Sequence, residues 1–247
     1  MNKLNFENIY NNLPKNRVKV DIFEEIDSTN DEAKRISLEN EFHLIISEKQ
    51  LKGRGRYGKK WSSPDSQNIY MTICTQNDLS FAPESLITGI ICSKSINNIN
   101  KNINIGLKWP NDLILNKKKI GGILIEKEHY QNKVKTIIGI GINLNIEKKE
   151  SWWGDLSKFN LENRRNDLII QITKNLIKVF DEKDFDWLNE WRHACVHINK
   201  KIKIYNNQDK KQNAIFKDVD SYGNAIIETE NGLEVFSSGQ ITIKGIY

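Results

Sequence analysis

Apolar and polar positions alternate in blocks along the chain, and the spacing within each block predicts which element it forms. Runs rich in β-branched residues, with polar turns at both ends, are typical of strands. Before residue 150 they predict strands at residues 18–23, 43–48, 68–75, 105–115, 119–126 and 136–146. Because the polar turn at 116–118 joins two of these runs directly, we expect an antiparallel or mixed sheet.

Helices are predicted where apolar residues recur three and four positions apart. This spacing and the local turn signals predict helices at residues 27–38, 84–96, 167–180 and 185–193. At the start of the first of these, Thr29 and Glu32 fit a capping box. We therefore expect helices to flank the sheet.

The pattern changes at about residue 198, where short strands replace the longer elements. Turn signals such as Ser221-Tyr222-Gly223-Asn224 separate the apolar runs. Strands are predicted at residues 201–205, 213–219, 225–228, 233–237 and 240–244. Five short strands with tight turns are typical of a small β-barrel. The pattern thus predicts an α+β protein with two domains, a larger one at residues 1–197 and a small β-barrel at residues 198–247.

Composition limits the class of protein further. The chain has 247 residues and is 38% hydrophobic, which is enough to bury a substantial core. Its three cysteines have no disulfide or zinc spacing, which predicts a reducing cytoplasm. We find neither a signal-peptide pattern at the amino terminus nor an apolar run near the roughly 20 residues of a membrane helix. The net charge of +5 is modest and does not by itself indicate nucleic-acid binding.

One segment between two predicted strands is built to hold an anion. It reads Gly53-Arg54-Gly55-Arg56-Tyr57-Gly58-Lys59-Lys60-Trp61, with three glycines and four basic side chains, and we call it the basic loop. Glycines expose consecutive backbone N–H groups, and arginine offers a rigid fork that matches phosphate or carboxylate oxygens. The loop predicts a substrate with phosphates. A mobile basic loop that touches RNA is the alternative from this segment alone.

Three further motifs accompany the basic loop, and the set resembles biotin protein ligases in order and spacing. The motifs are Ser28-Thr29-Asn30, Lys108-Trp109-Pro110-Asn111-Asp112-Leu113-Ile114-Leu115 through Lys119-Ile120-Gly121-Gly122-Ile123-Leu124-Ile125-Glu126, and Gly139-Ile140-Gly141-Ile142-Asn143-Leu144-Asn145. Each motif alone is weakly specific, but the four in order are highly specific. The resemblance extends over nearly the whole chain.

The resemblance implies a catalytic domain like that of class II synthetases, followed by an SH3-like barrel. It also implies ATP-dependent attachment of biotin to a lysine of a biotin carboxyl carrier protein, through biotinyl-5′-AMP. The implied ligands are biotin, ATP and Mg²⁺, and the implied acceptor is an acetyl-CoA carboxylase subunit or a similar biotin-dependent carboxylase. Only about twenty residues precede the first predicted strand, so we expect the monofunctional form without specific DNA binding.

The implied reaction brings two anions together, the biotin carboxylate and the α-phosphate of ATP. The carboxylate is already ionised at neutral pH, so the enzyme needs cations and N–H donors rather than a base. By resemblance, the catalytic cations are Arg54, Arg56, Lys108 and Lys119. The resemblance places biotin against Ser28, Thr29, Asn30, Gln50, Arg54, Gly55, Arg56 and Lys119, ATP against Gly53, Arg56, Lys108, Asn111 and Asn143, and Mg²⁺ at Asp112.

Two of these assignments have a structural alternative. Ser28-Thr29-Asn30 also fits a plain helix cap, and capping and ligand contact can coexist. Lys119 belongs to the polar run 117–119, which is normally a solvated turn. We assign Lys119 to the site because of its distance along the sequence from Lys108 and from Gly121-Gly122, which follow it.

Two other features stay outside the predicted site. Cys195 lies between His193 and His197, a spacing compatible with a metal site but common by chance. Trp152 and Trp153 are each suited either to stacking on adenine or to anchoring a loop.

Three other functions compete with biotin ligation. One is a catalytically inactive sensor of biotin, against which the presence of every charged residue that the chemistry needs argues. A lipoate protein ligase shares the architecture, but the tandem basic loop and Lys-Trp-Pro-Asn-Asp motif favour biotin. A non-catalytic nucleic-acid-binding module needs exposed aromatic residues interleaved with basic ones. The carboxyl-terminal strands offer Tyr205, Phe216, Tyr222 and Phe236 without such clustering. The sequence does not fix the oligomeric state, and exposed edge strands are compatible with a homodimer.

Overall fold

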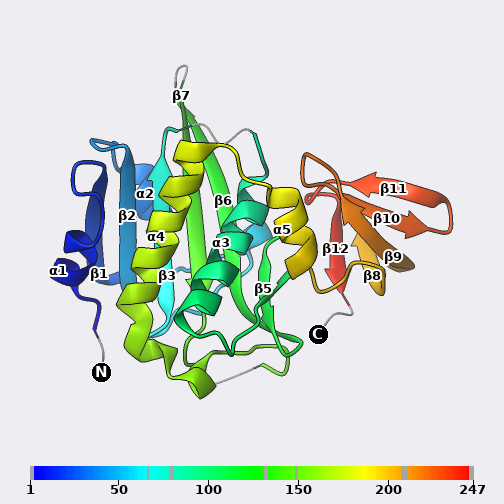
Figure 1. Cartoon of the computed structure of the whole chain (residues 1–247), viewed down its shortest axis with the longest axis horizontal. Helices are drawn as coiled ribbons and strands as arrows, with labels where there is room; N and C mark the ends of the chain where they lie inside the picture. Colours follow the sequence, from blue (N-terminus) through cyan, green and yellow to red (C-terminus); the bar gives the residue numbers. More distant parts are fainter. Residues whose placement is uncertain are drawn as a thin grey trace.

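The computed structural model describes residues 3–65, 67–77, 81–130, 133–147, 150–206 and 211–244. These residues form a large sheet with helices on its faces and a second sheet near the carboxyl end (Figure 1). The helices are α1 (Phe6–Asn11), α2 (Thr29–Arg35), α3 (Glu84–Ile99), α4 (Arg165–Glu182) and α5 (Trp187–Ala194), with 3-10 turns η1 (Arg56–Gly58), η2 (Ser157–Phe159) and η3 (Leu161–Arg164). The large sheet contains β1 (Val18–Ile26), β2 (Phe42–Gln50), β3 (Ile69–Thr75), β4 (Gly106–Lys108), β5 (Asp112–Leu115), β6 (Lys118–Tyr130) and β7 (Lys133–Ile142).

The seven strands of the large sheet lie in the order β1-β2-β3-β7-β6-β5-β4. β1 and β2 run parallel, and α2 connects them, whereas every other neighbouring pair is antiparallel. In the centre, Gly139 of β7 lies between Thr72 of β3 and Leu124 of β6. The predicted mixed sheet flanked by helices is confirmed.

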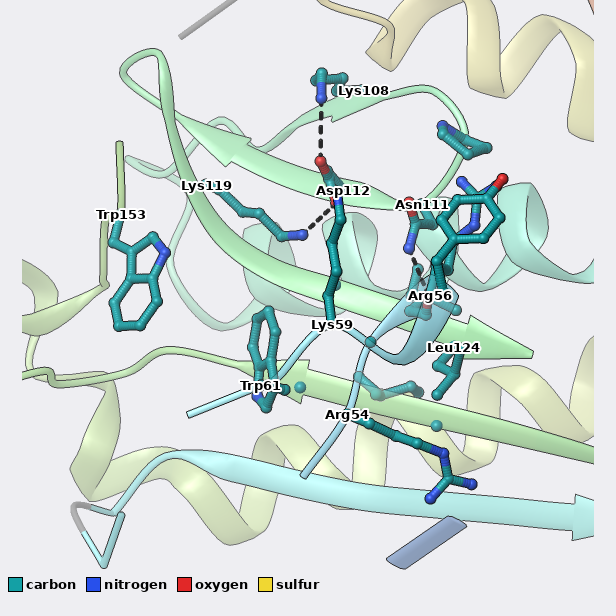
Figure 2. A pocket seen from close by; sticks show the side chains of 18 of the residues that line it. Arg54, Arg56, Lys59, Trp61, Lys108, Asn111, Asp112, Lys119, Leu124 and Trp153 are labelled. Carbon is teal, nitrogen blue, oxygen red and sulfur yellow. Dashed lines mark hydrogen bonds and ion pairs between the residues drawn. The ribbon is translucent and has the colours of Figure 1, made fainter. Parts of the chain in front are cut away.

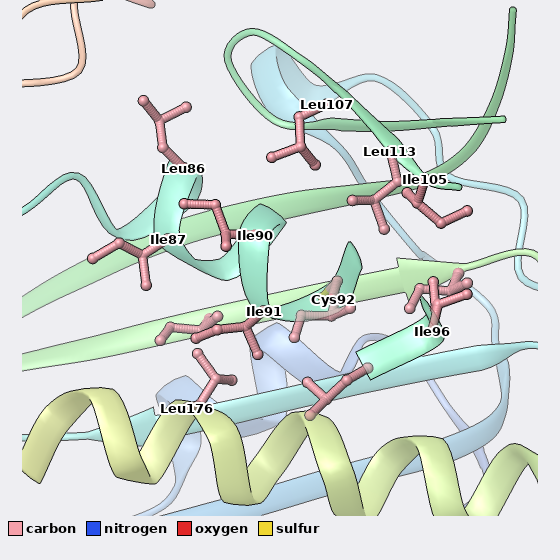
Figure 3. Packing of buried hydrophobic residues seen from close by; sticks show 14 of the residues in the cluster. Leu86, Ile87, Ile90, Ile91, Cys92, Ile96, Ile105, Leu107, Leu113 and Leu176 are labelled. Carbon is pink, nitrogen blue, oxygen red and sulfur yellow. The ribbon is translucent and has the colours of Figure 1, made fainter. Parts of the chain in front are cut away.

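The large sheet is covered on both faces, because successive side chains of a strand point to opposite sides. α3 and α4 lie across one face (Figure 1). Figure 3 shows that apolar side chains of α3 pack there between Leu176 of α4 and Leu107 and Leu113 of the β4–β5 hairpin. On the other face, a smaller cluster joins Ala33 of α2 to strand residues such as Ile137.

The second sheet contains β8 (Lys200–Asn206), β9 (Lys211–Val219), β10 (Ala225–Thr229), β11 (Gly232–Phe236) and β12 (Ile241–Lys244). These strands pair in the antiparallel order β11-β10-β9-β8-β12. All five strands were predicted, but the described residues do not close into a barrel, because β11 and β12 are the two edges. The small β-barrel expected from the sequence is therefore an open sheet over these residues.

Trp109 connects the two sheets. Its side chain is fully buried, its Nε1 donates a hydrogen bond to the carbonyl oxygen of Gly223 at 2.9 Å, and its ring centroid lies 6.5 Å from that of Phe216. A division of the chain into domains 1–197 and 198–247 stays a prediction, and residues 1–2 and 245–247 lie outside the described residues.

Two local predictions were wrong. The cap of α2 is Ser28, whose Oγ accepts from the Asp31 N–H at 3.4 Å, whereas the Thr29 hydroxyl donates to Gln50 instead. The run 105–115 is not one strand but the hairpin of β4 and β5. Pro110 lies in the turn of this hairpin and has no N–H to donate to a ladder.

Among the described residues, no helix combines the length and the apolar character that crossing a membrane requires.

Candidate active site

A cavity of about 870 Å³ opens on the α2 side of the large sheet. Its walls come from α2, β6, β7, the basic loop and β12 of the second sheet. Most of the predicted site residues line it, namely Ser28, Thr29, Asn30, Gln50, Arg54, Gly55, Arg56, Lys108, Asn111, Asp112 and Lys119. The remaining two predicted residues, Gly53 and Asn143, are not among the residues of the cavity wall.

A cluster of charged side chains forms one part of this wall, and we call it the lysine cluster. Lys108 ends β4, Asp112 begins β5 and Lys119 follows the turn into β6, so two hairpin turns bring them together. Asp112 Oδ1 lies 2.5 Å from Lys119 Nζ, and Asp112 Oδ2 lies 3.2 Å from Lys108 Nζ. Figure 2 shows both ammonium groups directed at Asp112, with Lys59 of the basic loop extending toward the same carboxylate.

Burial and charge set the protonation of this cluster. Burial lowers the pKa of Lys108 below its ordinary value, and the nearby carboxylate of Asp112 offsets only part of that effect. Burial also acts to raise the pKa of Asp112, but Lys119 and Lys108 outweigh it and hold that pKa below its ordinary value. Asp112 is therefore ionised at neutral pH, and three lysines around one carboxylate make this part of the cavity attractive to anions.

Away from the lysine cluster, Thr29, Asn30 and Gln50 give the wall neutral polar groups. The Thr29 N–H and hydroxyl donate to Gln50 Oε1 at 2.9 and 3.1 Å. Thr72 Oγ1 lies 2.7 Å from Asn30 Oδ1 and 2.8 Å from Thr29 Oγ1. These bonds fix the orientation of several donors and acceptors in a mostly buried place, which suits an uncharged polar ligand group.

The basic loop folds back on itself as a short hairpin. Its base is closed by a bond from the Trp61 N–H to the Gly53 oxygen at 2.9 Å, and its tip by one from the Gly55 N–H to the Lys59 oxygen at 2.7 Å. A Cβ on Gly53 would lie 2.6 Å from Ser63 Oγ, too close for any side chain. Gly53 thus permits the close approach of the two arms rather than lining the cavity.

The two arginines of the basic loop have partners other than the lysine cluster. Arg54 forms ion pairs with Asp31 and with Glu126, whose Oε2 lies 2.8 Å from Arg54 Nη2. Arg56 stacks on the ring of Tyr57, and both side chains donate to the carbonyl oxygen of Ser238, in the turn between β11 and β12. In this arrangement Arg54 and Arg56 anchor the loop, whereas Lys108 and Lys119 outnumber the one carboxylate that they share and leave that part of the cavity with net positive charge.

Trp61 is a cavity residue that the sequence analysis missed. Its ring lies against β7, where a Cβ on Gly141 would be only 2.7 Å away, and Lys119 Nζ lies 5.4 Å from its centroid. Figure 2 shows Trp153 beyond Lys119, near the same part of the cavity. The available signal was a pair of glycines, because Gly122 and Gly141 face each other across β6 and β7 and leave room for a ring.

Two predicted asparagines support the walls. The Asn143 side chain donates to the Gly154 oxygen at 3.1 Å and so holds the segment that carries Trp153. The Asn111 side chain donates to the Ile123 oxygen at 2.7 Å while it also borders the cavity. Their contacts in this structure are with the protein backbone.

The Cys195 and His197 pair lies away from this cavity. Cys195 Sγ is 3.5 Å from His197 Nδ1, and burial raises the pKa of the thiol to about 12 and lowers that of the imidazole to about 3. Both groups are therefore neutral at pH 7. Over the described residues, no group of three or more His, Cys, Asp or Glu side chains is placed to hold a metal ion.

Two family models match parts of this chain. Residues 22–143 match the model of the Biotin/lipoate A/B protein ligase family, and residues 197–244 match that of the Biotin protein ligase C terminal domain. The chain therefore belongs to the biotin/lipoate protein ligase family. The second match places it within that family among the biotin protein ligases.

Individual relatives agree with this placement. The bifunctional ligase/repressor BirA of Escherichia coli is 28% identical over 233 residues, which cover 89% of this chain and 72% of that protein. The biotin--[acetyl-CoA-carboxylase] ligase of Mycobacterium tuberculosis is 22% identical over 211 residues, or 80% of this chain and 77% of that protein. The biotin protein ligase of Aquifex aeolicus, solved with biotin and ATP, has the same fold, with a TM-score of 0.75 at 24% identity, covering 92% of this chain and 98% of that one.

Proposed function

We propose that this protein uses ATP to attach biotin to a lysine of a biotin carboxyl carrier protein. One observation carries the proposal: a single cavity joins the lysine cluster to a wall of fixed neutral polar groups. The first part suits phosphates and a carboxylate, and the second suits the uncharged ureido ring of biotin.

In the first reaction a carboxylate oxygen of biotin attacks the α-phosphorus of ATP, and pyrophosphate leaves. The product is biotinyl-5′-AMP. Lys119 and Lys108 reduce the repulsion between the two anions and stabilise the negative charge that develops on the reacting oxygens. Trp61 offers an aromatic surface beside Lys119 for a planar ring.

Asp112 is the residue that would hold Mg²⁺. It provides the one carboxylate among the described residues of the cavity wall, and Mg²⁺ is usually held by one or two carboxylates together with substrate phosphates. When bound, the ion would neutralise phosphate charge. Asp112 also orients both lysines, so its contribution has an electrostatic part independent of the metal.

In the second reaction the ε-amino group of the acceptor lysine attacks the acyl carbon of biotinyl-5′-AMP, and AMP leaves. This mixed anhydride must be kept from water until the acceptor binds. The basic loop borders the cavity and is joined through Tyr57 to Ser238, in the turn between β11 and β12, so it is placed to act as a lid.

The match of the carboxyl-terminal residues to a domain of biotin protein ligases favours biotin over lipoate. The name of the Mycobacterium tuberculosis relative favours an acetyl-CoA carboxylase subunit as the acceptor. A cytoplasmic location, a homodimer and the absence of specific DNA binding stay predictions.

Ligand-dependent exchange of pyrophosphate into ATP tests the proposal. Purified protein with ATP and Mg²⁺ should catalyse exchange when biotin is added, and much less when lipoate is added at the same concentration. Exchange that depends on lipoate, or none with either acid, would contradict the proposed function.

A further inference from the structure

Glu126, near the middle of β6, connects α2 to the basic loop. It ends one of the family motifs, but it is neither a predicted site residue nor a residue of the cavity wall. Its side chain is 24% exposed and accepts hydrogen bonds from three donors. Glu126 Oε2 lies 2.8 Å from both Asn30 Nδ2 and Arg54 Nη2, and Oε1 lies 2.8 Å from Lys34 Nζ. One carboxylate thus joins the ligand wall, the helix and the loop.

The bond from Asn30 determines which way its amide faces. With Nδ2 directed at Glu126, Asn30 Oδ1 faces the Thr72 hydroxyl at 2.7 Å. The amide has little other room, because a Cβ on Gly139 would lie 2.2 Å from Asn30 Oδ1. Glu126 therefore helps to hold a group of the neutral wall in one orientation.

The bond from Arg54 fixes the basic loop. Asp31 is the second carboxylate on Arg54, so the guanidinium is held between α2 and β6. Burial opposes the charge of Arg54, but the hydrogen bonds to Asp31 and Glu126 outweigh it and raise the pKa of Arg54. The side chains of Arg54, Asp31 and Glu126 are 23–29% exposed, and a network this sheltered is stronger than an isolated surface pair.

We propose that Glu126 is a positioning residue that couples the biotin end of the cavity to the closed state of the basic loop. The inference rests on the proposed function, because it assigns biotin to the wall that contains Asn30. A ligand that engages Asn30 stabilises the arrangement in which Glu126 also holds Arg54. Ligand binding and loop closure therefore favour each other, as any two events that share one state must.

The substitution Glu126→Gln tests this coupling with little change in shape. All three partners of Glu126 are donors, whereas glutamine offers one oxygen and a donor amide. At least one partner must then face another donor, and Arg54 loses half of its countercharge. Because a hydrogen bond to a charged group contributes about 1.5–3 kcal/mol, we expect the KM for biotin to rise about tenfold or more, with a change in kcat of about twofold or less.

The second readout is cleavage of the basic loop by trypsin, which cuts after Arg54, Arg56, Lys59 and Lys60. Biotin should protect the loop in the wild-type protein and should protect it much less in Glu126→Gln. Glu128→Gln is the matched control, because Glu128 lies two residues along the same strand and pairs with Lys135 at 3.0 Å, outside this network. The control should keep the wild-type KM and protection.

Asp31→Asn serves if Glu126→Gln does not fold. It weakens the hold on Arg54 but leaves the Glu126 bond to Asn30, so protection of the loop by biotin should fall. Because closure and binding are coupled, the KM for biotin should also rise, but by less than in Glu126→Gln.

A folded Glu126→Gln variant with wild-type KM and wild-type protection would overturn the coupling. If that variant does not fold, unchanged protection in Asp31→Asn would overturn it. Absence of biotin-dependent pyrophosphate exchange in the wild-type protein would instead contradict the proposed function.

Discussion

Replacing Lys119 with alanine should separate its chemical role from its structural one. Lys119 Nζ lies 2.5 Å from the buried carboxylate of Asp112, which Lys108 contacts from its other oxygen. Removing one preorganised donor from a site of developing negative charge costs about 3–4 kcal/mol of the barrier. Formation of biotinyl-5′-AMP should therefore slow by about 10²–10³.

The accompanying loss of folding stability should be smaller. Asp112 keeps Lys108 in the variant, so the cost should be about 1–3 kcal/mol, as for one lost partner of a buried polar group. A protein whose unfolding free energy is about 5–15 kcal/mol stays largely folded after such a loss. Unfolding cannot then account for a rate change of two to three orders of magnitude.

The assay is single-turnover formation of the adenylate, with urea unfolding measured on the same preparations. Lys127→Ala is the control, because Lys127 lies on the same strand and also pairs with a carboxylate, that of Glu84, but does not line the cavity. A rate within about threefold of wild type in folded Lys119→Ala, or an equal loss in the control, would refute this role.

Three further changes have defined outcomes. Asp112→Asn should raise the Mg²⁺ concentration needed for half-maximal rate several-fold, whereas an unaltered metal dependence would make Asp112 purely structural. Gly141→Ala should displace Trp61, because the added Cβ would lie 2.7 Å from its ring; tryptophan fluorescence should change and stability should fall by about 1–3 kcal/mol, and an unchanged spectrum would contradict the packing. His197 has a pKa of about 3 in the folded protein, so below about pH 6.5 the unfolded chain binds a proton that the folded chain does not. Unfolding free energy should thus fall by ~1.4 kcal/mol per unit as pH drops from 6.5 toward 4, and His197→Gln should lose this component of the slope.

Local pattern was sufficient for most of the fold. The alternation of short apolar runs indicated all the strands of both sheets, apart from the division of residues 105–115 into β4 and β5. Local pattern could not predict whether the second sheet closes into a barrel. Closure depends on pairing between the edge strands β11 and β12, which the pattern within a single strand does not specify.

The sequence located the charged residues of the site but not all of their structural surroundings. The spacing of the motifs located Lys108, Asp112 and Lys119, and the structure brings them together. The sequence placed Lys119 in a run that is normally a solvated turn, but Lys119 is the second residue of β6 and only 17% of its side chain is exposed. The pair with Asp112 therefore gives Lys119 a structural role beside the catalytic one proposed for it.

The sequence did not predict which residues pair with the basic loop. Arg54 reads as a free cation in the sequence, yet its carboxylate partners lie 23 and 72 residues away, at Asp31 and Glu126. Such pairs exist only after α2 and β6 have been placed side by side. A basic residue in a glycine-rich loop thus predicts an anion near it, but not whether that anion is a ligand or the protein itself.

The most direct measurement of the central claim is the intact mass of a biotin carboxyl carrier domain after incubation with this protein, ATP, Mg²⁺ and biotin. The account predicts the addition of one biotinyl group at a single lysine, dependent on ATP, and none when lipoate replaces biotin. An unmodified carrier in the presence of active, folded protein, or a lipoyl group added instead, would contradict it.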